Sequence, residues 1–382
     1  MRREPSVSTT LAMITSQAFS LVNFRGPLIA ALVSRGTQVY ALAPDYDDDL
    51  KQRVAALGAH PVDCSMARAG LNPLRDLGDL WRLSRLLRRL APDATLAYFV
   101  KPVIYGSIAA WLAGVPDRYS LVAGLGFVFT DDSASRRPGR RLLRAVVAKL
   151  YRFALARNRR VILQNQDDLH TLASSGILDP RKAVLIRGTG VDLDHYGLAP
   201  VVRSPPVFLL VARMLREKGV HDFVAAARLL KARHPQARLI LVGGTDPNPG
   251  SVAAAELESW AQEGMVEWVG QVDDVRPWMA RASVFVLPSY YREGVPRGNQ
   301  EAMAMGRPIV TTDWVGCRET VEDGVNGFMV PVRDPVALAR AMSRFIENPD
   351  LIETMGLAGR RMAEERFDVH DINRRIVEVL QP

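Results

Sequence analysis

The chain lacks long hydrophobic runs and holds only two cysteines among its 382 residues. Its best candidate for a membrane span, residues 103–115, is shorter than the roughly 18 apolar residues that a bilayer requires. Near the N-terminus, the apolar stretch Leu11–Ile14 is too short for a secretory signal. Cys64 and Cys317 lie far apart and form no disulfide or zinc motif. These absences predict a cytoplasmic protein whose cysteines are small core residues.

Motifs for metals and dinucleotides are also missing. The six histidines include no pair at the spacing of metal ligands. No Gly-x-Gly-x-x-Gly follows Leu11–Ile14, which disfavours a dinucleotide oxidoreductase. Asp45 and Asp47, like Asp192 and Asp194, have the spacing of the short acidic motif of metal-dependent transferases. The first pair lies in an acidic loop and the second in an expected interdomain link. We therefore expect no metal and no cofactor.

Positive charge is concentrated in the first half of the chain. Residues 1–200 contain 27 Lys/Arg against 17 Asp/Glu, whereas residues 201–382 contain 22 against 24. Residues 136–160 alone carry ten Lys/Arg and no acidic residue. A cationic segment of this kind, with apolar residues between the charges, favours an anionic membrane surface. No nucleic-acid recognition motif accompanies it, so we expect no nucleic-acid partner.

Short apolar runs alternate with helix-length segments along the whole chain, which is typical of parallel α/β sheets. The expected strands are Leu11–Ile14, Val39–Ala43, Thr95–Val100, Tyr119–Val122, Val161–Gln164, Val184–Ile186, Val207–Ala212, Arg238–Val242, Val266–Val269, Val284–Leu287 and Pro308–Thr311. A proline-rich link near residues 195–206 predicts two doubly wound domains, 1–197 and 198–365, facing each other across a cleft. Residues 366–382 form a last helix that we expect to pack on the first domain.

Two segments of the second half carry the candidate chemistry. Between Glu293 and Glu301, a Gly/Pro loop after an apolar strand enters a helix, and such a helix N-terminus is a ready anion site. Two carboxylates beside a phosphate repel it unless they bind hydroxyls, which sugars supply. Arg213 and Lys218 follow the strand Val207–Ala212 and place two cations at the same edge. Taken singly, the glutamate pair is also compatible with a solvated residue and a helix start, and the two cations are better explained as ordinary surface charge.

Together these segments resemble the retaining glycosyltransferases of glycosyltransferase family 4, which have the GT-B fold of two Rossmann-like domains. The family's two glutamates, with seven residues between them, are matched by Glu293 and Glu301, and its Arg and Lys by Arg213 and Lys218. Further resemblance lies in residues 188–192, 306–313 and 324–328. Segments 24–28, 101–106, 124–127 and 316–320 are similar to members that build bacterial capsule, O-antigen or exopolysaccharide.

The resemblance implies a role for each matching residue. Arg213, Lys218 and Glu293 are the expected catalytic residues, the two cations on the donor diphosphate and Glu293 on the hydroxyls of the transferred sugar. Expected donor-binding residues are Glu301 on the ribose, Val295, Arg297, Gly298 and Asn299 at the phosphates and sugar, and Gly270, Gln271 and Val272 at the base. On the acceptor side the expected residues are Ser16, Gln17, Phe19, Lys101, Gly124, Gly126 and Phe127.

Two departures from the family pattern bear on these roles. Many members have Gly-Gly after the first strand, where this chain has Ser16–Ser20, and the bulkier residues should change how the acceptor approaches the phosphates. The segment before Glu301 is usually aliphatic, and here it is Gly298-Asn-Gln300. A polar Asn299 favours helix capping or extra donor contacts.

The function implied is transfer of a hexose or N-acetylhexosamine from a UDP-sugar to a saccharide, with retention and without a metal. In similar members the acceptor is commonly carried on a polyprenyl diphosphate, so we expect peripheral association with the inner face of the membrane. Two alternatives stay open, a UDP-sugar 2-epimerase of the same fold and a non-catalytic partner that binds nucleotide sugar or polysaccharide. The donor sugar, the acceptor, the linkage and the oligomeric state do not follow from the sequence.

Overall fold

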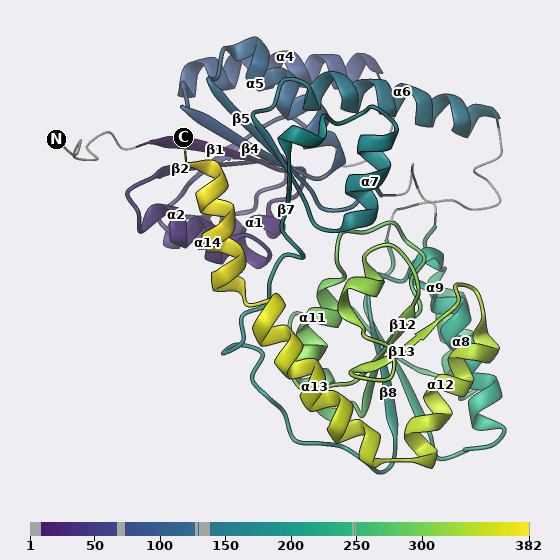
Figure 1. Ribbon diagram of the computed structural model, residues 1–382. Coiled ribbons are helices and arrows are strands. Elements are labelled where there is room, and N and C mark those ends of the chain that lie inside the picture. The colour runs from purple at the N-terminus through teal and green to yellow at the C-terminus, as the bar shows by residue number, and fades with distance from the viewer. Residues whose placement is uncertain are drawn as a thin grey trace. The chain divides into compact units, whose positions relative to one another are not determined.

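The computed structural model describes residues 9–66, 73–126, 129, 138–246, 248 and 250–381. The chain forms two compact units, one comprising residues up to Ile186 together with those from His370 onward, the other comprising Arg187–Val369. Each unit is a parallel sheet with helices on both faces (Figure 1). Within the described part of the chain, no helix combines the length and the apolarity that crossing a membrane requires.

The first unit has a seven-stranded sheet in the order β3-β2-β1-β4-β5-β6-β7, with every pairing parallel. The strands are β1 (Thr10–Ile14), β2 (Gln38–Ala43), β3 (His60–Asp63), β4 (Ala94–Tyr98), β5 (Asp117–Val122), β6 (Arg160–Leu163) and β7 (Ala183–Leu185). Its helices are α1 (Phe19–Asn23), α2 (Gly26–Val33), α3 (Asp48–Ala56), α4 (Pro73–Leu90), η1 (Pro102–Gly106), α5 (Ser107–Ala113), α6 (Pro138–Leu155), α7 (Gln166–Ser174), η4 (Pro180–Lys182) and α14 (Val369–Leu380).

The second unit has a six-stranded parallel sheet in the order β10-β9-β8-β11-β12-β13. Its strands are β8 (Val207–Val211), β9 (Arg238–Val242), β10 (Glu267–Gly270), β11 (Val284–Leu287), β12 (Ile309–Thr312) and β13 (Gly327–Val330). The helices are η5 (Arg216–Lys218), α8 (Val220–Lys231), α9 (Ala254–Gln262), α10 (Arg276–Arg281), α11 (Arg297–Ala304), η6 (Cys317–Thr320), α12 (Pro335–Glu347) and α13 (Asp350–Arg366).

The central strands of both sheets have residues that are buried on both faces. All four residues of β11 are buried, as are the first four of β8, so these central strands read as continuous apolar runs. Because every strand of a sheet points the same way, the carboxyl ends of β8, β9, β10 and β11 lie at one edge. Loops at that edge are where ligands of such sheets bind.

The chain passes from the first unit to the second between Ile186 and Arg187, earlier than the proline-rich link near residues 195–206. Contacts explain the difference, because the segment after Arg187 is already packed on the second unit. The Val191 N–H donates to Phe367 O at 2.7 Å, and the Ala199 N–H donates to Met305 O at 3.3 Å. The prolines therefore lie within the second unit and do not divide the two.

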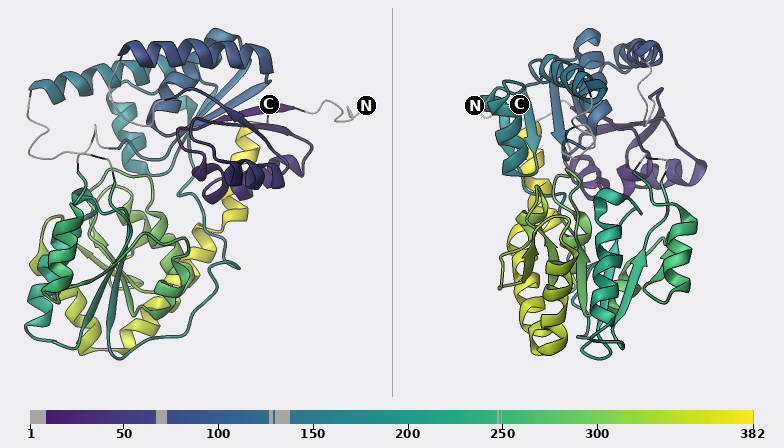
Figure 2. Two further views of the ribbon diagram at one scale, coloured as in Figure 1. Left: turned by 180° about the vertical axis from the view of Figure 1, so that it is seen from behind. Right: turned by 90° about the vertical axis from the view of Figure 1, so that its right-hand side faces the viewer.

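The chain returns to the first unit at helix α14. Its apolar side chains Ile372, Ile376, Val377 and Leu380 are buried in the same core cluster as Leu11 and Met13 of β1. The last helix thus completes the core of the first unit. Figure 2 shows its ribbon, in yellow, in two further views.

The apolar side chains of helix α6 are only partly covered. Tyr151, Ala154 and Leu155 are buried, but Leu142 is 67% exposed and Val146 is 47% exposed. The helix packs against η1 and α5. Part of this apolar face is left in contact with solvent.

Candidate functional site

The candidate donor site lies at the carboxyl edge of the six-stranded sheet, where the loop after β11 enters helix α11. The helix begins at Arg297, and its N-cap, Pro296, provides no side-chain cap. The first N–H groups of any helix have no partner within the helix, and the helix dipole adds a partial positive charge there. An anionic group placed at the start of α11 would therefore be stabilised by the backbone alone.

Lys218 and Glu293 form an ion pair at this edge. The Lys218 Nζ lies 2.7 Å from both Glu293 carboxylate oxygens. Both side chains are largely shielded, with 12% and 17% exposed. Ser289 Oγ donates a further hydrogen bond to Glu293 Oε1 at 3.1 Å. The carboxylate that would otherwise repel a phosphate is thus neutralised by the cation expected to bind one.

The loops that carry this pair are tied together by backbone contacts. The Tyr290 N–H donates to Glu217 O at 2.8 Å, and Ser289 Oγ lies 3.3 Å from the same oxygen. Gly219, with φ of +76°, approaches Pro288 so closely that a Cβ would lie 2.1 Å from Pro288 O. The loop after β8 and the loop after β11 therefore behave as one piece.

The second glutamate, Glu301, also has a cationic partner. Arg297 Nε donates to Glu301 Oε1 at 2.6 Å across one helical turn. The Tyr196 hydroxyl faces this pair. Burial raises the pKa of Tyr196 most, and the negative charge of Glu301 raises it further. The sequence assigned only the backbone of Arg297 to the donor site, whereas the structure places its side chain on Glu301.

Arg213 lies in a separate pair at the same sheet edge. Its Nη1 is 3.0 Å from Asp246 Oδ2, and the Asp246 side chain is 8% exposed. Asp246 was not predicted from the sequence, although its loop begins with Gly243-Gly244 directly after β9. That loop also contacts the expected base-binding segment, because the Gly244 N–H donates to Gln271 Oε1 at 3.2 Å.

The remaining donor-side residues surround the start of α11 and the end of β10. Val295 and Asn299 are buried, and Asn299 Nδ2 donates to Thr320 Oγ1 at 2.8 Å rather than capping the helix. A Cβ on Gly298 would meet the Phe285 ring at 3.0 Å, so only glycine fits there without displacement. Gly270 ends β10 with φ of +84°, and Val272 packs against the apolar core.

One residue of this region was not assigned from the sequence although its motif was noted. Gly316, with φ of +78°, precedes η6, and a Cβ there would lie 2.2 Å from Gly294 O. The turn before Cys317 thus packs directly against the loop that contains Glu293. Burial raises the pKa of the Cys317 thiol to about 12, so it is an inert core residue.

Acceptor-side candidates in the first unit are more dispersed. Ser16 is buried and lines a cavity of about 610 Å³ at the carboxyl ends of β1, β2 and β3. The other lining residues are Pro44, Asp45, Asp63, Cys64, Ser65, Met66 and Arg75. Gln17 O accepts a hydrogen bond from Ser20 Oγ at 2.6 Å, and Phe19 is partly exposed with its ring against Phe24.

The other acceptor-side candidates follow β4 and β5. Gly124 and Gly126 adopt φ of +96° and +68°, conformations that favour glycine. Phe127 lies outside the described residues. Lys101 is paired within the unit, with its Nζ 2.8 Å from Asp76 Oδ1 and only 14% of its side chain exposed. The Lys101 charge therefore anchors α4 to the segment that follows β4.

The Lys101–Asp76 pair yields a stability prediction. Lys101→Ala removes the cation 2.8 Å from the shielded Asp76 carboxylate and leaves the Tyr105 hydroxyl at 3.2 Å, so we expect the free energy of unfolding to fall by about 3 kcal/mol. Lys51→Ala is the matched control, because its pair with Asp63 is exposed and its loss should change the free energy of unfolding much less. Urea denaturation measures both, and equal losses would contradict the anchoring role.

The described residues contain no cluster of His, Cys, Asp or Glu that could hold a metal ion. The two short acidic motifs have local structural roles instead. Asp47 caps α3 by accepting from the Leu50 N–H at 2.7 Å. Asp192 Oδ1 accepts from the N–H groups of Asp194 and His195 at 3.0 and 2.9 Å.

Comparison with known proteins gives matches over most of the chain. Residues 205–348 match the family model described as glycosyl transferases group 1, and residues 24–189 match that described as a glycosyl transferase 4-like domain. The chain is 28% identical to N,N'-diacetylbacillosaminyl-diphospho-undecaprenol alpha-1,3-N-acetylgalactosaminyltransferase of Campylobacter jejuni, over 89% of this chain and 90% of the relative. It is 23% identical to the capsular polysaccharide biosynthesis glycosyltransferase CapM of Staphylococcus aureus, over 76% and 77%.

A solved structure shares the fold. The crystal structure of Anabaena Alr3699/HepE in complex with UDP and glucose superimposes with a TM-score of 0.76 at 20% identity. The superposition covers 98% of this chain and 99% of that one. Both parallel-sheet units therefore have counterparts in the same order in that protein.

Proposed function

The chain belongs to glycosyltransferase family 4 and has its GT-B fold, and on that premise we propose that it transfers a sugar from a UDP-sugar to a saccharide carried on a polyprenyl diphosphate. The observation that carries the proposal is the Lys218–Glu293 pair beside the start of α11. It supplies a cation and backbone donors for a diphosphate, together with a carboxylate for sugar hydroxyls.

The same edge of the sheet supports a proposal for the donor's nucleotide and for the fate of its anomeric bond. Breaking the bond leaves charge on the diphosphate, which Lys218, Arg213 and the N-terminus of α11 can stabilise without a metal. We propose attack from the same face with retention, in which a donor phosphate oxygen takes the acceptor proton. Uracil suits the segment Gly270–Val272, and UDP occupies the related HepE structure.

The acceptor proposal rests on the first unit and on the relatives. The Campylobacter jejuni relative is named for a diphospho-undecaprenol acceptor, and CapM for capsular polysaccharide biosynthesis. In this chain the cavity lined by Ser16 offers hydroxyl and carboxylate groups suited to a saccharide. We therefore place this chain in the assembly of a bacterial surface polysaccharide.

A lipid-linked acceptor requires access to a membrane, and helices α4, α5 and α6 offer a surface for it. Helix α5 packs against both α4 and α6, and Figure 1 shows the three along one side of the first unit. The exposed large apolar side chains of this α4–α6 surface are Leu74, Leu77, Trp81, Trp111, Leu112, Leu142, Val146 and Phe153. Apolar side chains among cations suit the interface of an anionic bilayer.

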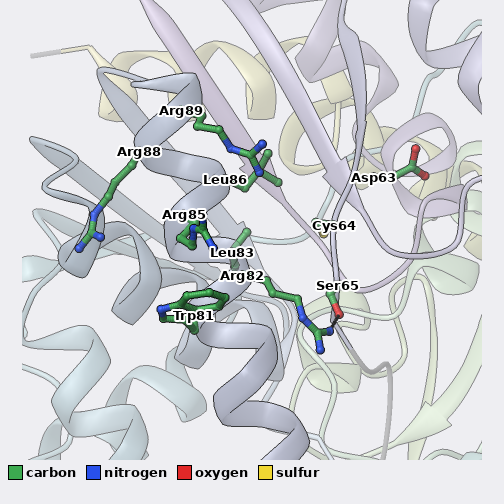
Figure 3. A pocket seen from close by; sticks show the side chains of 10 residues that line it. All are labelled: Asp63, Cys64, Ser65, Trp81, Arg82, Leu83, Arg85, Leu86, Arg88 and Arg89. Carbon is green, nitrogen blue, oxygen red and sulfur yellow. Dashed lines mark hydrogen bonds between the residues drawn. The ribbon is translucent and has the colours of Figure 1, made fainter.

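The cations of this surface lie against its aromatic rings. Arg85 stacks on Trp81 with its guanidinium 4.6 Å from the ring centre, and Arg157 lies 4.3 Å from that of Trp111. Figure 3 shows the α4 part, where Arg82, Arg85, Arg88 and Arg89 line a cavity of about 580 Å³ next to Asp63 and Ser65. We propose peripheral association of this surface with the inner face of the membrane.

The α4–α6 surface yields a binding prediction. The protein should co-sediment with vesicles of anionic phospholipid at low salt and be released at high salt, because screening weakens the arginine contacts. Replacing both Leu77 and Trp81 by Ser should weaken binding about tenfold, since each substitution removes exposed apolar area that the membrane would bury. Leu229→Ser, at an exposed leucine of the second unit, should leave binding unchanged. Absence of binding at low salt would reject the membrane proposal.

The transferase proposal is tested by nucleotide release from a panel of UDP- and GDP-sugars, with and without lipid extract. We expect one UDP-sugar to release UDP only when lipid is present, and Glu293→Ala to abolish the release. Conversion of one UDP-sugar into another without lipid would instead support the 2-epimerase. Tight nucleotide binding without turnover would support a binding partner.

A further inference from the structure

Gln300 is a buried amide in helix α11 whose bonds lead away from the helix. Its side chain is fully buried, and Oε1 accepts from the Gly190 N–H at 3.1 Å. On its other side, Nε2 donates to Val295 O at 3.2 Å and to Pro296 O at 3.4 Å. One side chain thus joins two backbone segments that lie 105 or more residues apart in sequence.

The first of these segments is the one by which the chain enters the second unit. It runs close against Gln300, because a Cβ on Gly188 would lie 2.8 Å from Gln300 Oε1. It also runs beside the segment by which the chain leaves, since Val191 pairs with Asp368 and a Cβ on Gly190 would lie 2.7 Å from Val369 Cα. The Gln300 amide therefore bonds to a backbone segment that its contacts with residues 368–369 already hold in place.

The second segment is the turn that directs backbone N–H groups toward the proposed diphosphate. Pro296 has no N–H of its own and is the N-cap of α11 without a side-chain cap. In many helices a Ser, Thr or Asp at the N-cap fixes this turn. Here the carbonyl oxygens of Val295 and Pro296 instead accept hydrogen bonds from Gln300 Nε2, which fixes the turn.

We propose that Gln300 is a positioning residue for donor binding: it fixes the Val295–Pro296 turn against the entry segment so that the first N–H groups of α11 point at the donor phosphates. This inference rests on the proposed function, because it presumes a nucleoside diphosphate at α11. The segment by which the chain enters the second unit also reaches the residue after Gln300, since the Tyr196 hydroxyl faces Glu301 and Arg297.

The experiment compares two ligands that differ only in the phosphates. Calorimetry gives the UDP affinity and ligand-observed NMR gives the uridine affinity, for wild type and Gln300→Met, which keeps the volume and loses the hydrogen bonds. We expect UDP affinity to fall about tenfold, because a loosened turn misdirects the N–H groups, while uridine affinity stays within about twofold. Equal loss for both ligands, or no loss for either, overturns the proposal.

A matched control separates positioning from loss of stability. Asn158 is a buried amide of the first unit whose Nδ2 lies 2.5 Å from Ser120 Oγ, and Asn158→Leu removes that bond. It should lower the melting temperature as Gln300→Met does, yet leave UDP affinity unchanged. If Asn158→Leu weakens UDP binding equally, the effect is general destabilisation and the proposal is wrong.

A second variant keeps the test decisive if Gln300→Met does not fold. Gln300→Glu retains the oxygen for the Gly190 N–H, and its acid form still donates to Val295 O, whereas its carboxylate does not. Relative to wild type, UDP affinity should fall between about pH 5 and pH 8 as the acid ionises. A pH-independent ratio contradicts the proposal. Failure of wild type to bind UDP at all would contradict the proposed function instead.

Discussion

Lys218→Ala should reduce sugar transfer by about 10²- to 10³-fold, because it removes a preorganised cation from the leaving diphosphate. The change also leaves the Glu293 carboxylate, 17% exposed, without the cation 2.7 Å away. Without the Lys218 charge, the Glu293 carboxylate would repel the donor phosphates, so UDP affinity should fall together with turnover. Initial rates of UDP release and calorimetry of UDP binding measure the two effects.

Two comparisons make the Lys218 prediction specific. Lys231→Ala removes a lysine whose Nζ lies 2.5 Å from Gly264 O, at the opposite end of α8 from Lys218, and should leave transfer unchanged. Lys218→Ala combined with Glu293→Ala should lose little more activity than the worse single variant, because the two residues act as a pair. Strictly additive losses would show that the pair seen in the structure does not operate in the reaction.

Gly219→Ala should both destabilise the second unit and abolish transfer. A Cβ at this position would lie 2.1 Å from Pro288 O, and φ of +76° adds strain for any side chain. The overlap can be relieved only by separating the loop with Lys218 from the loop with Glu293. We expect about 1–3 kcal/mol beyond the cost of the backbone conformation alone.

Gly264→Ala is the control for that backbone cost. Gly264 has a similar φ of +72°, and no atom lies within 4 Å of its missing Cβ. Its replacement should therefore cost about 1–2 kcal/mol and leave UDP release at the wild-type rate. Urea denaturation and the release assay distinguish the two glycines. Equal behaviour would mean that the close approach of Gly219 to Pro288 has no functional consequence.

The architecture was largely predictable because most strands are short, continuous apolar runs. Two strands were missed for identifiable reasons. Strand β3 at the sheet edge, His60–Asp63, contains a proline and no fully buried residue, so it carries no apolar run. Strand β13 begins at Gly327, where a Cβ would lie 1.8 Å from Ile309 O, and close packing selected glycine over a strand former.

The candidate site was predictable where residues adjoin a strand end or share a helix. Glu293 and Lys218 each follow an apolar strand, and Arg297 lies one turn before Glu301, so their neighbourhood follows from local pattern. Asp246 and the bonds of Gln300 did not follow, because they depend on loops distant in sequence. The roles of these residues in donor and acceptor binding stay predictions for the experiments above.

The most direct test of the central claim is the mass of the acceptor after reaction. A polyprenyl-diphosphate saccharide from the lipid extract would be incubated with the protein and the UDP-sugar found by nucleotide release, then analysed by mass spectrometry. We predict that the lipid-linked saccharide gains the mass of one sugar residue, and that Glu293→Ala abolishes the gain. An unchanged saccharide mass, despite release of UDP or conversion of the donor, would contradict the claim that this chain extends a lipid-linked saccharide.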